Sequence, residues 1–484
     1  MMSESFGWVN MFQLRQYQKD ILNKLYKSVK NNRKVLLSLP TGGGKTVMMA
    51  SWANLMAERG LRTAIIVNRE ELVEQTVKLL PDCSVLKSRW KNFDSSKLIQ
   101  VIMLQTAYNR RQQLLDLDCD FIFFDEIHDY YDGQMFASIC DCQTKAKIIG
   151  VSATPIDNKG YLLKGFDDYI NEIQTQDLID MKYLVKPQYY TPQSYNLDLS
   201  FIRITNGDYD IGELDDLMAN TSCAAKIYNE WHNIASDLKT IVFCSSIKQA
   251  KILNEYFSST GVKSDVVFSS RVDRSKVIQR FIDNKIQVIF NVGILVAGFD
   301  DKQVECIVFA NPTKILRRYL QQCGRGLRIA PNKIQCIMLD CADIVRQHGF
   351  CNDLRYFRPK QRLADSCTVK QCPECGAIVE KTISICPYCG YEFTEIDEQC
   401  NNSTNKKNIQ RLEKAFSMQN EIKKQIAELV EERGYKNGYK WFLFIDCLKT
   451  KRPTESSIQF FKRKITKLNK IKNKGWKLAS LKYD

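Results

Sequence analysis

The stretch Leu39-Pro-Thr-Gly-Gly-Gly-Lys45-Thr46 follows a short apolar run, Lys34–Leu39, and precedes a helix-length segment, Thr46–Arg59. Glycines between a strand and a helix allow backbone N–H groups to converge on phosphate oxygens, and the start of the helix adds its dipole. Leu39 stands where such loops usually begin with glycine, but Gly-Lys-Thr is intact. The stretch therefore predicts a phosphate-binding loop in a parallel α/β protein.

Such a loop implies ATP and Mg²⁺ as cofactors. Lys45 is expected to reach the β- and γ-phosphates, and the Thr46 hydroxyl to ligate Mg²⁺. The loop residues predicted to contact the nucleotide are Thr41, Gly42, Gly43, Gly44, Lys45 and Thr46.

A second element of the same site follows about eighty residues later. There an apolar strand ends in Asp125-Glu126-Ile127-His128. A strand that delivers two acids at its carboxyl end suits a metal-nucleotide site: we expect Asp125 to hold Mg²⁺ and Glu126 to deprotonate the attacking water. In this tetrad His128 is expected to couple two parts of the molecule.

Short β-rich runs alternate with helical patterns, which predicts parallel sheets covered on both faces. The alternation restarts near Thr240, so two α/β units in series are expected. The predicted strands of the first unit are Lys34–Leu39, Thr63–Val67, Leu98–Leu104, Asp120–Asp125 and Lys147–Val151. Those of the second are Thr240–Cys244, Asp265–Phe268, Gln287–Phe290, Cys306–Phe309 and Gln335–Leu339.

Further motifs occur in a fixed order around these two elements. They are Leu14-Arg15-Gln-Tyr-Gln18, Asn68–Gln75, Ser152-Ala153-Thr154, Asn291–Asp300 and Gln321-Gln-Cys-Gly324-Arg325-Gly-Leu-Arg328. With the phosphate loop and the acidic tetrad, this series resembles the superfamily 2 helicases of the DEAD/DEAH type, across about two-thirds of the chain. The resemblance implies two tandem RecA-like lobes and an ATP-dependent helicase.

The resemblance also implies roles for individual residues. Arg15 and Gln18 would recognise adenine, and Gly298 and Asp300 would lie at the nucleotide cleft. Gln321, Arg325 and Arg328 would act from the second lobe, where guanidinium groups can stabilise the charge of phosphoryl transfer when the lobes close. Ser152 and Thr154 would link hydrolysis to movement along the strand.

Two cysteine pairs lie downstream of the helicase motifs. Cys372-Pro-Glu-Cys375-Gly and Cys386-Pro-Tyr-Cys389-Gly are CPxCG turns, and four thiolates in a tetrahedral arrangement suit structural Zn²⁺. The segment resembles a zinc ribbon, which either contacts nucleic acid or only stabilises a segment with little core. We expect Cys367, just upstream, to be free.

The net charge of +15 is concentrated at the end of the chain. From Asn401 onward there are 21 Lys+Arg against 8 Asp+Glu, so this region carries +13 and the rest is nearly neutral. Basic residues there are interleaved with aromatic ones: Tyr435, Tyr439, Trp441, Phe442 and Trp476. A nucleic-acid partner is expected, since cations neutralise phosphates and aromatics stack on bases. A solvated tail, or a small helical core, is the alternative.

The 484 residues are expected to form two or three domains. The predicted domains are a first lobe with a connecting segment over 1–219, a second lobe over 220–350, a zinc ribbon over 367–395 and a basic helical module over 404–484. Neither a membrane span nor a signal peptide is expected. We predict a monomeric cytoplasmic protein of a bacterium or of a phage-infected cell, whose other thiols are reduced.

The function predicted from these features is ATP-dependent unwinding or remodelling of DNA. A likeness to phage recombination and repair helicases of the UvsW type, and a more distant one to XPB-like enzymes, favours branched or forked DNA. Three alternatives remain: an RNA helicase, the motor subunit of a restriction or defence complex, and a zinc-ribbon binding or transcription factor with a vestigial ATPase.

Overall fold

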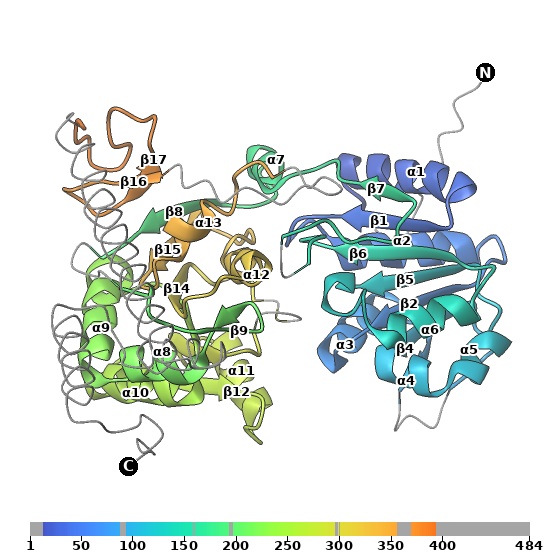
Figure 1. Cartoon of the computed structure of the whole chain (residues 1–484), viewed down its shortest axis with the longest axis horizontal. Helices are drawn as coiled ribbons and strands as arrows, with labels where there is room; N and C mark the ends of the chain where they lie inside the picture. The colour runs from blue at the N-terminus through green and yellow to red at the C-terminus, as the bar shows by residue number, and fades with distance from the viewer. Residues whose placement is uncertain are drawn as a thin grey trace, which may run out of the picture. The chain divides into compact units, whose positions relative to one another are not determined.

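The structure is a computed structural model of the chain. It describes residues 13–87, 93–157, 160–192, 197–295, 299, 301–355 and 369–393. Two parallel sheets with helices on both faces form two lobes, and both lobes belong to one compact unit (Figure 1). The predicted α/β architecture of two tandem parallel-sheet lobes is thereby confirmed.

The first lobe is built on a seven-stranded sheet in the order β3-β4-β2-β5-β6-β1-β7, in which all neighbours are parallel. The strands are β1 (Lys34–Ser38), β2 (Thr63–Val67), β3 (Ser84–Leu86), β4 (Ile99–Met103), β5 (Phe121–Asp125), β6 (Lys147–Ser152) and β7 (Asp168–Ile170). Their side chains alternate between two hydrophobic layers. Val35 and Leu37 of β1 belong to one layer, whereas Leu36 belongs to the other.

Six helices cover this sheet. The helices α1 (Gln16–Asn31), α2 (Lys45–Ala57) and α3 (Glu70–Leu79) pack on one face. The helices α4 (Leu104–Asn109), α5 (Arg111–Asp116) and α6 (Gln134–Cys142) pack on the other. Because both faces are covered, the central strands are apolar along their whole length, as the sequence pattern indicated.

The second lobe is built on a six-stranded parallel sheet in the order β12-β13-β11-β14-β15-β8. Its strands are β8 (Lys186–Tyr190), β11 (Thr240–Cys244), β12 (Ser264–Phe268), β13 (Val288–Val292), β14 (Cys306–Ala310) and β15 (Gln335–Asp340). One face packs against α9 (Thr221–Ala235) and α10 (Ile247–Ser259). The other packs against α11 (Arg274–Ile282), α12 (Leu316–Gly326) and α13 (Ile344–His348).

The segment between the sheets contains α7 (Thr175–Asp180), the short hairpin β9 (Ile204–Thr205) and β10 (Asp208–Tyr209), and α8 (Ile211–Met218). It also contains β8, which pairs with β15 although it precedes residue 219. The connecting segment, which was predicted to precede the second lobe within residues 1–219, therefore contributes one strand to the sheet of the second lobe.

Residues 369–393 contain an antiparallel pair, β16 (Val369–Gln371) and β17 (Ile378–Glu380). This pair is joined to the end of β8: Tyr190 forms a β-bridge with Ala377, and Thr191 N donates to Gly376 O at 3.2 Å. The expected helical module over 404–484 and its basic and aromatic residues lie outside the described residues. Among the described helices, none has the length and apolar character that a membrane span requires.

Candidate nucleotide site

The phosphate loop lies between β1 and α2, where the sequence predicts it. Gly42 and Gly44 have φ of +85° and +83°, a region that side chains other than glycine rarely adopt. A Cβ on Gly44 would also lie 2.4 Å from Gln18 Nε2, and a Cβ on Gly42 would lie 2.8 Å from Leu184 Cδ2. These two glycines are therefore required both by backbone conformation and by close packing.

The predicted adenine element forms the start of α1 and braces this loop. Tyr17 Oη donates to Gly43 O at 2.8 Å, and Gln18 Nε2 donates to the same carbonyl at 3.3 Å. Gln18 Oε1 accepts from Arg15 N at 3.0 Å, so the buried Gln18 amide also fixes the entry into the helix. Gln18 thus contacts the phosphate loop itself, a role that its motif did not indicate.

Two acidic side chains lie at the carboxyl end of β5, beside the phosphate loop. Lys45 Nζ is 2.7 Å from Glu126 Oε1. Glu126 has φ +49° and ψ +44°, in the left-handed region, which is uncommon for a residue other than glycine and clusters at functional sites. Its Oε2 is buried and has no hydrogen-bond partner among the described residues. An ionised oxygen of this kind can accept a proton from water.

The pKa values of the two carboxyl groups are shifted in opposite directions. Burial, reinforced by the neighbouring Glu126, raises the pKa of Asp125 to about 7. Burial also acts to raise the pKa of Glu126, but the charge of Lys45 and its hydrogen bond outweigh this effect and lower that pKa to about 2. The raised pKa of Asp125 indicates a carboxylate with too little nearby positive charge. Asp125 and the Thr46 hydroxyl, which are hard oxygen ligands, therefore suit Mg²⁺.

His128 connects the two lobes. Its Nδ1 is 2.7 Å from Ser152 Oγ in the first lobe, and its Nε2 is 3.3 Å from Gln321 Nε2 on α12 of the second. Burial lowers the pKa of His128, which favours the neutral ring. Since Gln321 Nε2 donates to Nε2, the ring proton lies on Nδ1 and is donated to Ser152. Arg317 adds a hydrogen bond from the second lobe to His128 O, at 3.0 Å.

The two predicted arginines of the second lobe meet at one carbonyl group. Arg325 and Arg328 both donate from NH1 to Phe299 O, with Arg328 at 2.9 Å. Arg325 is buried, and its charge contributes to lowering the pKa of Glu126. It therefore acts electrostatically on the first lobe. Gly298 and Asp300, predicted to lie at the same cleft, are outside the described residues.

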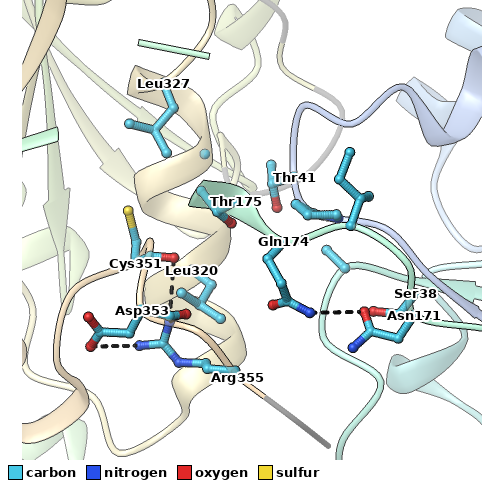
Figure 2. A pocket seen from close by; sticks show the side chains of 14 residues that line it. Ser38, Thr41, Asn171, Gln174, Thr175, Leu320, Leu327, Cys351, Asp353 and Arg355 are labelled. Atoms are coloured by element: carbon cyan, nitrogen blue, oxygen red, sulfur yellow. Dashed lines mark hydrogen bonds and ion pairs between the residues drawn. The ribbon is translucent and has the colours of Figure 1, made fainter. Parts of the chain in front are cut away.

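The helix α12 packs tightly on the phosphate loop. A Cβ on Gly324 would lie 2.2 Å from Thr41 Cγ2, so only glycine permits this approach. A pocket opens beside the contact (Figure 2), lined by Ser38, Thr41, Leu320, Leu327 and Cys351, among others. Arg355 in its wall donates to His348 O at 2.9 Å and to Phe350 O at 2.7 Å, so it stabilises the turn after α13.

The four predicted metal-binding cysteines form one cluster. The Sγ atoms of Cys372, Cys375, Cys386 and Cys389 all lie within 4.8 Å of one another. The two CPxCG turns have the same backbone pattern, with Gly376 N donating to Cys372 O at 3.0 Å and Gly390 N to Cys386 O at 2.9 Å. Both glycines have positive φ, of +71° and +78°. Four thiols in this arrangement suit zinc. Cys367 lies outside the described residues.

Sequence reasoning missed several contributors to the site. Tyr183 stacks on Arg15, Arg317 bonds to the His128 carbonyl, and Leu184 packs on the phosphate loop. Arg317 could have been noticed as a basic residue just upstream of Gln321. Tyr183 and Leu184 carry no local signal, because their contacts depend on the path of the connection between the sheets.

Comparison with known protein families gives three matches along the chain. Residues 11–157 match the family described as type III restriction enzyme, res subunit. Residues 222–330 match the helicase conserved C-terminal domain. Residues 370–395 match the uncharacterised protein family UPF0547.

Individual relatives agree with these matches. A 51.5 kDa protein of a Lactococcus phage is 26% identical over 369 residues, which cover 74% of this chain and 78% of the phage protein. A protein of Saccharomyces cerevisiae named as an ATP-dependent helicase, IRC3, is 28% identical over 355 residues, covering 68% of this chain but only 51% of the yeast protein. A fragment of an HsdR subunit of a type I restriction enzyme from Vibrio vulnificus has a similar fold. Its TM-score is 0.57 at 16% identity, over 72% of this chain and 69% of the fragment.

Proposed function

Because the chain belongs to the superfamily 2 helicases and is an ATP-hydrolysing enzyme, we propose that it moves along and remodels DNA, acting on branched, forked or recombination intermediates. One observation carries the proposal. His128, in the acidic tetrad of the first lobe, contacts Gln321 of the second. Hydrolysis at Glu126 and relative movement of the lobes are therefore linked through adjacent side chains.

The residues act in sequence in the proposed cycle. Lys45 and the loop glycines bind the triphosphate, while Arg15 and Gln18 recognise the base. Thr46 and Asp125 would hold Mg²⁺, which would neutralise charge on the phosphates. Glu126 takes the proton of the attacking water, and Arg325 and Arg328 stabilise the charge that develops. Gly298 and Asp300 are proposed to complete the cleft.

Two features support DNA as the substrate. The first lobe matches a family described as the res subunit of type III restriction enzymes, and the two lobes have a fold similar to that of a type I restriction subunit. The region from Asn401 onward carries +13, which suits a phosphate backbone. We propose that the cysteine cluster binds one structural Zn²⁺. We also propose that the zinc ribbon and this basic region enlarge the DNA-binding surface.

The decisive experiment compares ATP hydrolysis by the full chain with single-stranded DNA, duplex DNA, a fork, a four-way junction and RNA. The proposal expects stimulation of at least tenfold by DNA, with the fork or junction effective at the lowest concentration. Stimulation by RNA alone would make the chain an RNA helicase. Absence of stimulation by any nucleic acid would refute the proposed function.

A second candidate is the motor subunit of a restriction or defence complex. The match of residues 11–157 to a restriction-enzyme family favours it. In this second proposal the motor would move along duplex DNA without separating the strands. Displacement of a third strand from a DNA triplex, together with no unwinding of a fork, would support this candidate. Unwinding of the fork would support the first.

A further inference from the structure

The nucleotide site includes a residue from the connection between the two lobes. Tyr183 lies between α7 and β8 and is half-buried. The guanidinium carbon of Arg15 is 3.9 Å from the centroid of the Tyr183 ring, which is the distance of a cation–π contact. Tyr183 lies in none of the helicase motifs, so its presence beside Arg15 calls for a separate explanation.

The Arg15–Tyr183 contact is tied to the phosphate loop through Tyr17. The ring centroids of Tyr17 and Tyr183 are 5.6 Å apart, and the neighbouring Arg15 acts to lower the pKa of Tyr17 against the larger effect of burial, which raises it. The Tyr17 hydroxyl donates to Gly43 O at 2.8 Å. The Arg15–Tyr183 pair is therefore joined to the loop that is proposed to hold the triphosphate.

The residues after Tyr183 anchor it to both lobes. Leu184 is buried and packs on Gly42, where a Cβ would lie 2.8 Å from its Cδ2. Leu184 also forms a β-bridge with Arg328, and Val185 N donates to Leu327 O at 2.9 Å. The backbone of Tyr183 is therefore held beside the phosphate loop on one side and the end of α12 on the other.

We propose that Tyr183 is a positioning residue that makes this site selective for the nucleobase. A guanidinium group has two flat faces, and an aromatic ring on one face fixes the plane of the group while leaving the other for a base. Tyr183 thus orients Arg15, and Arg15 stacks on the base. A purine offers a larger π surface than a pyrimidine, and a triphosphate without a base offers none. This proposal rests on the proposed function only in requiring that the chain binds a nucleoside triphosphate.

The test measures binding rather than turnover. Calorimetric titration of the full chain with ATP, UTP and inorganic tripolyphosphate is carried out for the wild type, Tyr183→Ala, Tyr183→Phe and Met181→Ala. Loss of a cation–π contact is expected to weaken ATP binding by about 3- to 20-fold in Tyr183→Ala. In the same variant the affinity for tripolyphosphate should remain unchanged, and the ratio of the ATP affinity to the UTP affinity should decrease.

The other variants make the result interpretable. Tyr183→Phe keeps the ring and should bind all three ligands like the wild type. Met181→Ala alters an exposed side chain of the same connection and should do the same. Unchanged ATP affinity in Tyr183→Ala, or equal weakening of ATP and tripolyphosphate, would overturn the proposal. These outcomes would leave the proposed function intact, because stimulation of wild-type ATP hydrolysis by DNA does not depend on the role of Tyr183. Failure of the wild type to bind ATP would instead refute the proposed function.

Discussion

Lys45 Nζ lies 2.7 Å from Glu126 Oε1, so the cation predicted to bind phosphate is the counter-ion of the carboxylate predicted to activate water. The charge of Lys45 keeps the pKa of Glu126 low against the effect of burial. If Lys45 turns toward phosphate oxygens when a nucleotide binds, its effect on Glu126 should weaken and the pKa of Glu126 should rise. This change would make Glu126 a stronger base in the nucleotide-bound state.

The pair can be tested through stability. In Lys45→Ala the nearly buried Glu126 carboxylate loses its ion-pair partner. Because an unpaired buried charge is destabilising, the free energy of unfolding should decrease by about 3 kcal/mol. The double variant Lys45→Ala/Glu126→Gln should recover most of this loss, because the uncompensated charge is gone. Urea denaturation measures both. The control is Lys24→Ala, whose ion pair with Glu172 is exposed and should contribute less than about 1 kcal/mol. Equal stability of the single and double variants would argue against the pair.

Glu126→Gln should bind ATP but hydrolyse it about 10² to 10⁴ times more slowly, because an amide cannot take the proton of water. ATP affinity by equilibrium binding and turnover by phosphate release are the two measurements. Glu58→Gln alters an exposed glutamate at the end of α2 and is the control. It should change neither the ATP affinity nor the turnover. Near-normal turnover in Glu126→Gln would refute its assignment as the base.

Asp125 predicts how the requirement for Mg²⁺ changes with pH. Its pKa is raised to about 7, so below that pH the carboxyl is mainly protonated and binds Mg²⁺ poorly. The Mg²⁺ concentration for half-maximal hydrolysis should therefore fall as the pH rises from 6 to 7, and level off by pH 8. The change should approach tenfold per pH unit at the acidic end. In Asp125→Asn the residual activity should show no such dependence. A flat profile in the wild type would count against ligation of Mg²⁺ by Asp125.

Gly324→Ala should prevent α12 from approaching the phosphate loop, because the added methyl group would overlap Thr41. We expect at least a tenfold loss of stimulated ATP hydrolysis while both lobes remain folded. The double variant Gly324→Ala/Thr41→Gly should restore part of the packing between α12 and the phosphate loop. The rescue should be partial because Thr41 itself belongs to the loop. Gly212→Ala, at a helical glycine where a Cβ has only one close neighbour, at 3.3 Å, is the matched control. Full activity in Gly324→Ala would show that closure does not need this approach.

Elemental analysis of the purified chain should find one zinc ion per molecule. Cys389→Ser should lower the zinc content and loosen residues 369–393 to proteolysis, while basal ATP hydrolysis survives because the nucleotide residues lie elsewhere. Cys142→Ser, a partly exposed thiol outside the cluster, should change neither property. Fully folded wild-type protein that contains no metal would exclude the zinc site.

The parts that were predictable from sequence are those with a local signal. The ten predicted strands lie within two residues of strands in the structure, because buried parallel strands are short apolar runs between turns. The phosphate loop and the acidic tetrad also need only a few neighbouring residues to be recognised. The sequence alone therefore predicts that Asp125, Glu126 and Lys45 share one site.

The parts that were missed depend on contacts between distant segments. β8 has the sequence Lys-Pro-Gln-Tyr-Tyr, whose polar residues and proline do not resemble a buried strand, and it belongs to the edge of its sheet. Tyr183 acquires its neighbour Arg15 only because the connection passes the start of α1. Neither periodicity nor motif spacing contains such information.

The position of β8 also bears on solubility. An edge strand exposes unpaired N–H and C=O groups, which other chains can join to form intermolecular sheets. Here Pro187 removes one donor, and the β-bridge between Tyr190 and Ala377 occupies the end of the strand. We expect this bridge, next to the first CPxCG turn, to limit self-association at the edge of the sheet. If the cysteine cluster binds zinc, removal of the ion should then promote aggregation without a direct effect on the nucleotide site.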